Sequence, residues 1–391
     1  MKVLLVSYAC KPFFGSEYAV GWNLFQHLSK LVDVHLITEA GPKQQIILEC
    51  KRLNIDVNKI SFIDIGESWR DACDQQGTWS FYYKYRNWQL QALNVAKELH
   101  NETPFDVVHH LNMIGYREPG FMNKLGIPFL IGPVGGFGGV KIQYFKYLTN
   151  KGAFIQIVKL ILNFLNMFLP RVRKTIMSAD KVLSAVPEAQ HGLSKWFKVS
   201  SEILPETGCG RFQGGSIERK NFIWVGKNVD RKMFSLAALS FINSKWSAQE
   251  KLIVLGKFKQ HERDKWQHKN IQFLGNIPQS EVYEHLSQSR ALLFPSLHEG
   301  NPHVVYEAIS CATPVICHDC YGMGYNVTDD LGIKIPVRNY ASSLEGFTSA
   351  LNKIDDRATY MFERDNFHKI TLANSWQSKA VQIVEVYKSI S

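Results

Sequence analysis

Short apolar segments alternate with longer segments of helical periodicity along most of this chain. The apolar runs form two series, the first at 2–8, 32–38, 60–65, 105–111, 127–132 and 181–186, the second at 222–226, 251–256, 271–275, 290–296, 313–317 and 332–337. Continuous apolar strands separated by helices are typical of parallel sheets covered by helices on both faces. The pattern therefore predicts an α/β protein with two doubly wound, Rossmann-like sheets.

The length of the chain agrees with two domains, because 391 residues exceed what one hydrophobic core normally supports. A polar segment with several glycines separates the two series. We expect an N-terminal domain at 1–205, a linker at 206–220 and a second domain at 221–373. Ligands of such domains bind outside the carboxyl ends of the strands, and two domains that face each other would hold them in a cleft.

Composition limits the compartment and the partners. Apolar residues make up 45% and charged residues 20%, as in folded proteins. The seven cysteines are odd in number and scattered, and the pair Cys317 and Cys320 has no second pair at metal-ligand spacing, so neither disulfides nor zinc or redox chemistry is expected. The first twelve residues lack a signal-peptide pattern and no uninterrupted apolar stretch of membrane-spanning length follows. We therefore expect a cytoplasmic protein.

The formal charge of +10 favours an anionic partner. Nucleotide phosphates, nucleic acid and an acidic membrane surface all qualify by charge. Nucleic acid is the weakest of the three, because no motif of that class occurs.

The segment 294–308 is the densest chemical signal in the sequence. Asn301 followed by Pro302 is typical of a helix start, with Asn301 as N-cap and Pro302 in the first helical position. The backbone amides of His303 and Val304 would then point out of the helix end, which attracts a phosphate or a sugar hydroxyl.

Two carboxylates border the same predicted pocket. Glu299 lies in the loop before the helix. Glu307 follows His303 by four positions, so His303 and Glu307 share one helix face. Carboxylates accept hydrogen bonds from sugar and ribose hydroxyls. The alternatives are an exposed loop acid at Glu299 and an ordinary helix charge at Glu307.

This segment closely resembles the E-x7-E signature of family-4 glycosyltransferases, which have the GT-B fold of two Rossmann-like domains facing across a cleft. Glu299 and Glu307 have the separation of that signature, and EAISCATPVI follows as in the family. The resemblance extends over nearly the whole chain. Its further matches are Gly226-Lys227 with Lys232, Gly15-Ser16-Glu17, the segment around His109 and His110, Gly132 to Gly136, and Ser375-Trp376 with Tyr387.

The resemblance implies roles for these positions. Lys227 and Lys232 would hold the donor pyrophosphate, Glu307 the ribose, and Glu299 the sugar. The donor-binding set would also include Gly15, Ser16, Gly300, Asn301, His303 and Val304. Residues 374–391 would form a closing helix that returns toward the N-terminal domain.

Four positions depart from the family pattern. Lys227 stands where Arg is usual, which exchanges a bidentate fork for a point charge. Met233, Ala312 and Tyr321 each stand where the family commonly has glycine. None of these changes removes a charge that the chemistry requires.

His109 and His110 end a predicted strand, where successive side chains point to opposite faces. One of them is therefore expected in the cleft as a catalytic residue. The sequence leaves open which one, and the alternative is that one is packed and the other exposed.

The segment 141–174 contains seven lysines or arginines and no acidic residue, around an apolar core. This pattern suits a helix in the interface of an anionic membrane, and equally a basic helix that covers the N-terminal sheet.

These observations predict a retaining glycosyltransferase that moves a hexose from a UDP- or GDP-sugar to a glycan or lipid-linked acceptor in bacterial surface polysaccharide assembly. No metal and no further cofactor are expected, because Lys227, Lys232 and the helix end can stabilise the departing diphosphate and no Asp-x-Asp occurs. The alternatives are an epimerase or phosphorylase of the same fold, or a catalytically silent membrane-bound scaffold.

Overall fold

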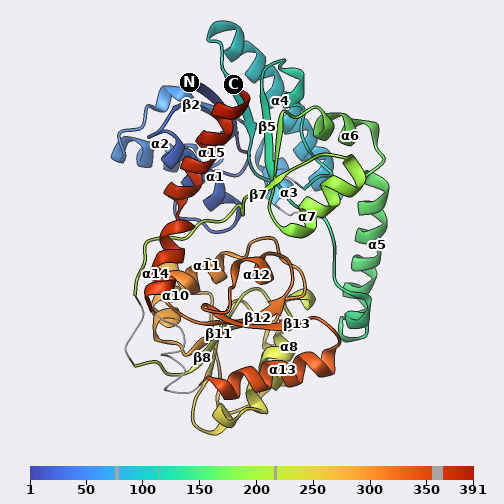
Figure 1. The fold of residues 1–391 in the computed structure, drawn as a ribbon, viewed down its shortest axis with the longest axis vertical. Coiled ribbons are helices and arrows are strands. Elements are labelled where there is room, and N and C mark those ends of the chain that lie inside the picture. The colour runs from blue at the N-terminus through green and yellow to red at the C-terminus, as the bar shows by residue number, and fades with distance from the viewer. Residues whose placement is uncertain (75–78, 114, 215–217, 355–363) are drawn as a thin grey trace. The chain divides into compact units, whose positions relative to one another are not determined.

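The computed structural model describes residues 1–74, 79–113, 115–214, 218–354 and 364–391 (Figure 1). The chain forms two compact units. Residues 1–137, 162–206 and 376–391 make up the first unit, and residues 138–161 and 207–375 the second. The chain thus passes between the units more than once.

The first unit is built on a seven-stranded parallel sheet. Its strands, in spatial order, are β3 (Ile60–Ile63), β2 (Asp33–Glu39), β1 (Lys2–Val6), β4 (Val107–His110), β5 (Phe129–Val134), β6 (Lys181–Ser184) and β7 (Glu202–Ile203). Its helices are α1 (Glu17–Leu28), α2 (Lys43–Arg52), α3 (Glu67–Asp74), α4 (Trp79–Glu102), α6 (Pro170–Met177), α7 (Pro187–Gly192) and α15 (Trp376–Ile390). Separate apolar clusters lie on the two faces of the sheet, which explains why its strands are apolar throughout.

The second unit is built on a six-stranded parallel sheet. Its strands, in spatial order, are β10 (Ile271–Gly275), β9 (Leu252–Leu255), β8 (Phe222–Val225), β11 (Ala291–Phe294), β12 (Val315–Asp319) and β13 (Gly332–Pro336). Its helices are α8 (Phe234–Ile242), α9 (Gln260–Arg263), α10 (Gln279–Gln288), α11 (His303–Ser310), α12 (Tyr321–Asn326), α13 (Tyr340–Lys353) and α14 (Arg364–Ala373). Helix α5 (Asn150–Asn166) begins in this unit and ends in the first.

All twelve strands expected from the apolar runs are present, and the predicted fold class is confirmed. Strand β7 was not predicted, because its two residues are too short to show a pattern.

Each sheet has one point where the order of its strands reverses. In the first sheet this point lies between β1 and β4, and in the second between β8 and β11. Ligands of doubly wound folds bind beyond the carboxyl ends of the two strands at this point. The loops after β8 and β11 are therefore the first place to look for a donor site.

Residues 138–161 belong to the second unit, although the sequence led us to expect one N-terminal domain up to residue 205. The Tyr321 hydroxyl accepts a hydrogen bond from the Gly139 amide and donates one to the Gly139 carbonyl, both at 2.9 Å. The Tyr144 hydroxyl contacts the Ser343 hydroxyl at 2.7 Å. These polar contacts hold the segment on the α12 and α13 side of its unit.

Helix α15 packs within the first unit, against α1. The Tyr387 hydroxyl contacts Nδ1 of His109 at 2.7 Å, and the Lys379 ammonium donates to the Pro205 carbonyl at 2.9 Å. The last helix of the chain is thus fixed to the first sheet by buried polar contacts as well as by its apolar face.

Among the described residues, no single helix has the length and hydropathy needed to span a membrane. Helices α5 and α6 meet the same criteria only as a pair, and they are bent by 66° at the break between them.

Candidate active site

The two loops at the strand-order reversal of the second unit are joined by their backbones. The Leu297 amide donates to the Arg231 carbonyl at 2.8 Å, and the Ser296 hydroxyl donates to the same carbonyl at 3.3 Å. The loop after β8 and the loop after β11 therefore form one surface at the carboxyl edge of the sheet.

Glu299 lies at the centre of this surface between two cations. Its Oε1 atom forms ion pairs with the guanidinium of Arg231 and with Nζ of Lys232, the latter at 3.1 Å, and accepts a hydrogen bond from the Ser296 hydroxyl at 3.0 Å. Only 12% of the Glu299 side chain is exposed. Burial alone would raise the pKa of this carboxyl, but Lys232 and Arg231 more than offset it and hold the pKa below its usual value. Glu299 is therefore ionised at neutral pH.

Lys232 is the most enclosed cation of the cluster. Its side chain is 14% exposed, and its ammonium lies 4.8 Å from the centre of the Phe294 ring. Burial lowers the pKa of Lys232, Glu299 raises it, and the charges of Arg231 and Lys227 lower it further. Lys227 itself is exposed. The three cations and one carboxylate leave a formal charge of +2 at this edge of the sheet.

Arg231 was not among the residues that the sequence singled out. It pairs with Glu299 and also donates to the His298 carbonyl at 3.0 Å. The only sequence signal for it was its position next to Lys232, because the family pattern directed attention to Lys227 and Lys232 alone.

Helix α11 begins one residue later than predicted. Pro302, with φ −68° and ψ 123°, is extended and occupies the N-cap position, and His303 is the first helical residue. The Asn301 side chain accepts a hydrogen bond from the Asn326 amide at 2.6 Å, and its carbonyl accepts one from the Thr207 hydroxyl at 2.9 Å. Asn301 thus holds the loop in place and is not the N-cap.

The amides of the first turn of α11 belong to His303 and Val304, as expected from the sequence. Burial lowers the pKa of His303 to about 4, so its ring is neutral at physiological pH. Gly300 is exposed, and its carbonyl oxygen would lie 1.9 Å from a Cβ atom at Gly322. The close approach of α12 to this loop therefore requires glycine at position 322.

Two glycines shape the loop after β8 in the same way. Gly226 has φ 158° and Gly256, at the end of β9, has φ 136°. A Cβ atom at Gly256 would lie 1.8 Å from the Gly226 carbonyl oxygen. Because Gly256 has no Cβ atom, the backbone before Lys227 can lie directly against the end of β9, and no larger residue fits at position 256.

Glu307 is half-buried on α11, and its Oε1 atom accepts a hydrogen bond from the Gln279 amide at 2.6 Å. Burial raises the pKa of Glu307 to about 7, and the Gln279 hydrogen bond acts in the opposite direction. Glu299 and Glu307 thus differ in charge state: the first is held ionised by cations, and the second titrates near neutrality.

Gly15 and Ser16 lie in the first unit, in the exposed loop after β1. Ser16 has φ 59° and precedes α1. The adjacent Glu17 carboxylate accepts a hydrogen bond from the Met113 amide at 3.2 Å, and the Glu17 carbonyl accepts one from the Asn112 side chain at 3.1 Å. These contacts join the loops after β1 and β4 at the strand-order reversal of the first sheet.

His109 and His110 point to opposite faces of the first sheet, as strand alternation requires, but both are buried. His109 contacts the Tyr387 hydroxyl through Nδ1 and the Gly132 carbonyl through Nε2, the latter at 2.9 Å. Nε2 of His110 contacts the Tyr85 hydroxyl at 3.3 Å. Burial lowers the pKa of His109 to about 4 and that of His110 to about 3, so both rings are neutral. The expectation that one of them is open to a cleft is not met within this unit.

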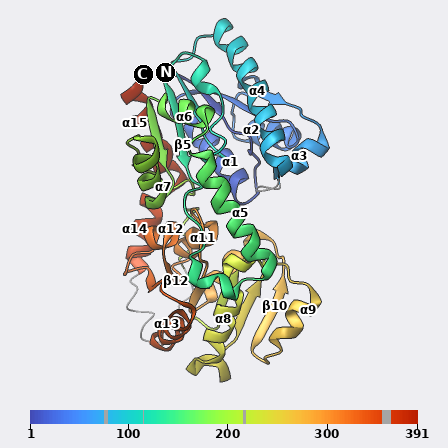
Figure 2. The ribbon, with the colours of Figure 1, turned by 90° about the vertical axis from the view of Figure 1, so that its right-hand side faces the viewer.

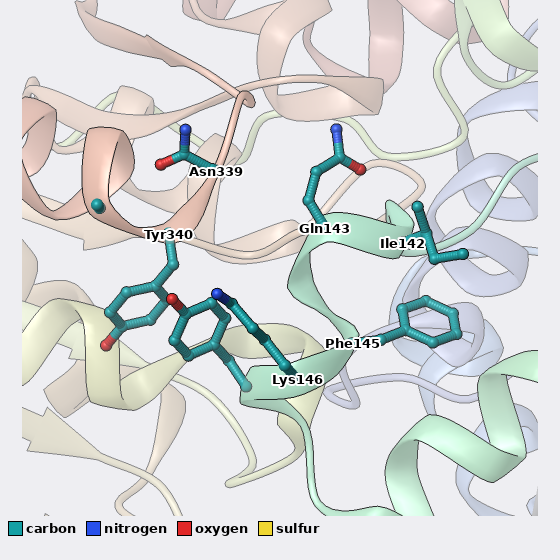
Figure 3. Close-up of a pocket in the computed structure, with 8 residues that line it drawn as sticks. Ile142, Gln143, Phe145, Lys146, Asn339 and Tyr340 are labelled. Carbon is teal, nitrogen blue, oxygen red and sulfur yellow. The ribbon is translucent and has the colours of Figure 1, made fainter.

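A shallow pocket of about 580 Å³ lies elsewhere on the second unit (Figure 3). It is lined by Ile142, Gln143, Phe145, Lys146, Tyr147, Asn339, Tyr340 and Ala341. The Tyr147 and Tyr340 rings stack at 4.1 Å beside it. None of the residues predicted for donor binding lines this pocket.

Comparison with known proteins agrees with this geometry. Residues 214–361 match the sequence model of the family "Glycosyl transferases group 1". The chain is 24% identical over 124 residues to the GPI3 subunit of phosphatidylinositol N-acetylglucosaminyltransferase from Saccharomyces cerevisiae. That match covers 32% of this chain and only 27% of the yeast protein.

Solved structures resemble the whole chain. The lipopolysaccharide outer core galactosyltransferase WaaB superimposes with a TM-score of 0.63 at 13% identity, covering 97% of this chain and 99% of WaaB. HepE from Anabaena, solved in complex with UDP-glucose, superimposes with a TM-score of 0.60 at 10% identity and covers all of both chains. The expected GT-B fold is confirmed, and the segment 214–361 is similar to group 1 glycosyltransferases.

Proposed function

We propose that this chain, which carries a group 1 glycosyltransferase domain, is a retaining, metal-independent hexosyltransferase that uses a UDP- or GDP-sugar. The observation that carries the proposal is the cluster of Arg231 and Lys232 around Glu299, at the carboxyl ends of β8 and β11. A nucleotide sugar offers two negative charges on its diphosphate, which match the formal charge of +2 that this cluster has together with Lys227.

The cations stabilise the leaving group. When the bond between the anomeric carbon and the phosphate oxygen breaks, negative charge develops on the departing diphosphate. Cations that are already in position stabilise this charge without reorganisation in the transition state. Lys232 is held by Glu299 and Phe294 before any donor binds, and Lys227 and Arg231 lie close enough to contribute.

The remaining donor-site residues bind the rest of the nucleotide sugar. Glu307 accepts hydrogen bonds from the ribose hydroxyls, and Glu299 accepts them from the hexose. The amides of His303 and Val304, at the start of α11, and the backbone of Gly300 and Asn301 bind the phosphates or the sugar. Gly15 and Ser16, in the first unit, are the remaining residues that we propose for donor binding.

The reaction needs no separate nucleophile on the protein. The acceptor oxygen forms a bond with the anomeric carbon on the face that the diphosphate leaves, and the acceptor proton passes to the departing phosphate oxygen. This course retains the configuration of the anomeric carbon. His109 and His110 do not react in this account. Their neutral rings position neighbouring groups through hydrogen bonds: His109 contacts Tyr387 and Gly132, and His110 contacts Tyr85.

The acceptor that we propose is a glycan or lipid-linked glycan of a bacterial surface polysaccharide, received by the first unit in the cytoplasm at the inner membrane surface. WaaB is described as a lipopolysaccharide outer core galactosyltransferase, and the yeast relative as a subunit of phosphatidylinositol N-acetylglucosaminyltransferase. Both names support an acceptor that carries a lipid.

A transfer assay tests the proposal. Candidate UDP- and GDP-hexoses are incubated with lipid-linked acceptors, and NMR determines the anomeric configuration of the product. We expect product of the same configuration as the donor, with activity unchanged within about twofold by a chelator. Inverted product, or a large loss that Mn²⁺ or Mg²⁺ restores, would refute the mechanism.

The same assay separates the two other enzyme classes. An epimerase would convert the nucleotide sugar without any acceptor, and a phosphorylase would require inorganic phosphate. Either result would replace the transferase assignment while leaving the donor site in place.

A further inference from the structure

Helix α5 exposes a row of large apolar side chains to solvent, where a helix of a closed domain would normally bury them. Six large apolar side chains follow one another at helical spacing and are 47–65% exposed: Phe154, Ile157, Ile161, Phe164, Leu165 and Phe168, the last just beyond the end of the helix. We call these six residues the apolar stripe. Surface helices normally turn such a stripe toward the core.

The most buried residue of α5, Asn163, is polar. Asn163 is 4% exposed; its carbonyl accepts a hydrogen bond from the Tyr116 hydroxyl at 2.6 Å, and its side chain donates to the Gly136 carbonyl at 3.4 Å. These contacts fix the rotation of the helix about its own axis. The apolar stripe therefore stays exposed; Figure 2 shows the course of α5 in green.

An aromatic cluster extends the apolar stripe. The Trp196 ring lies 5.9 Å from the Phe164 ring and 6.2 Å from the Phe168 ring, and the Lys195 ammonium lies 5.1 Å from the Trp196 ring. Tryptophan rings with adjacent lysines are enriched at the level of lipid headgroups.

All charged side chains of the segment 141–174 are positive. No acidic residue occurs between 141 and 174. Of the seven cations in this segment, Arg171 pairs with Glu118, Arg173 donates to the Trp196 carbonyl and Lys141 donates to the Val337 carbonyl. Lys146, Lys151 and Lys174 are exposed, and no ion pair or hydrogen bond of their ammonium groups is seen in the described part of the chain. The seventh cation, Lys159, lies on α5 and is half-buried.

The start of α5 is attached to the proposed donor site. The Asp230 carboxylate accepts hydrogen bonds from the Thr149 amide at 3.0 Å and from the Thr149 hydroxyl at 2.7 Å, just before the first turn. Asp230 immediately precedes Arg231 and Lys232. The first turn of α5 is thereby joined to the loop that carries Arg231 and Lys232.

We infer that α5 lies in the headgroup region of an anionic membrane, with the apolar stripe inserted and the exposed cations Lys146, Lys151 and Lys174 at the phosphates. An apolar face with Phe and Trp, flanked by lysines and without acids, is the composition of interfacial helices. A second copy of this chain is a poorer occupant, because two such faces would bring lysines together. The inference deepens the proposed function, since it rests on a lipid-linked acceptor that the enzyme must reach at a bilayer.

Vesicle binding of the full chain tests this inference. The stripe variant replaces Phe154, Ile157 and Ile161 with serine; the charge variant replaces the exposed Lys146, Lys151 and Lys174 with glutamine. The control variant replaces Leu48, Leu372 and Val381 with serine, which are 72%, 56% and 44% exposed but lie on three different helices. Cosedimentation uses vesicles of phosphatidylcholine alone, or of two parts phosphatidylcholine to one part phosphatidylglycerol.

We expect the parent chain to bind the anionic vesicles, more weakly as salt is added, and to bind neutral vesicles poorly. The stripe and charge variants should each lose at least about tenfold in partition, and the control variant less than about twofold. Because the stripe is exposed, the stripe variant should keep the melting temperature of the parent, which separates lost binding from lost folding.

Two results would overturn the inference. One is a stripe variant that binds anionic vesicles as well as the parent. The other is a parent that ignores vesicles but forms a dimer that the stripe variant does not, which would assign the face to a second copy. Vesicle binding needs no nucleotide sugar, so failure of the proposed transfer activity and failure of this inference are told apart directly.

Discussion

Lys232 is the residue on which the proposed chemistry depends most. Replacing Lys232 with Ala should weaken donor binding and lower kcat/KM by roughly 30- to 1,000-fold, because a positioned charge at a departing group contributes about 2 to 4 kcal/mol. Steady-state kinetics with the preferred donor measures this. Lys251→Ala is the matched control, since Lys251 is an exposed lysine just before β9, at the amino ends of the strands of the same sheet, where its ammonium donates to the Gln272 side chain at 3.3 Å. A Lys232 variant as active as the Lys251 variant would remove Lys232 from the mechanism.

A second prediction concerns Glu307 and the pH dependence of kcat/KM. Its pKa is raised to about 7 by burial, so the carboxyl is protonated and neutral below that pH and ionised above it. Ribose hydroxyls are held best by the ionised form. We therefore expect kcat/KM for the donor to rise as pH increases through about 7 and then to level off.

The variant Glu307→Gln keeps the size of the side chain but cannot titrate. Its kcat/KM should be low and flat across the same pH range. If the variant shows the same rise near pH 7 as the parent chain, the titrating group is not Glu307.

At the scale of elements, three of the four departures from the family pattern share one backbone feature. Met233, Ala312 and Tyr321, which stand where the family commonly has glycine, adopt φ values of 46°, 51° and 50°. All three end or begin a helix in the left-handed region, which costs a non-glycine residue about 1–2 kcal/mol. Such a backbone favours glycine at all three positions, and this chain has strained residues there. Tyr321 gains its two hydrogen bonds to Gly139 in exchange.

Ala312 offers a clean test, because it has only a methyl group to lose. Ala312→Gly should stabilise the chain by about 0.5–1 kcal/mol and raise its melting temperature. Ala350→Gly is the matched control, since Ala350 is buried in the middle of α13, where glycine should destabilise by about 1 kcal/mol. A loss of stability in both variants would mean that the φ of Ala312 carries no strain.

The sequence allowed the elements to be predicted well and the side-chain contacts poorly. Apolar runs located twelve strands, because a strand buried on both faces leaves a continuous signal. The pairing of Arg231 with Glu299, the burial of both histidines and the shift of the α11 N-cap to Pro302 all depend on neighbours that are distant in sequence. No local pattern encodes such contacts.

At the scale of the whole molecule, the division of the chain into units was the least predictable feature. Residues 138–161 group with the second unit through hydroxyls of Tyr144 and Tyr321, whose partners are nearly 200 positions away. The basic segment 141–174 is therefore not a single cover of the N-terminal sheet, because it begins in one unit and ends in the other. The sequence showed its charge and apolarity but not which way its side chains point.

The central claim is that the cations around Glu299 bind a nucleotide diphosphate sugar. Its most direct test is a melting-temperature screen of the parent chain and the Lys232→Ala variant against UDP- and GDP-hexoses, with free hexoses and mononucleotides as controls, because a ligand that binds only the folded state raises the melting temperature. The account predicts that a diphosphate sugar stabilises the parent chain more than any control ligand does, and that the variant loses most of this shift. It is contradicted if no nucleotide sugar raises the melting temperature of the parent, or if parent and variant are stabilised equally.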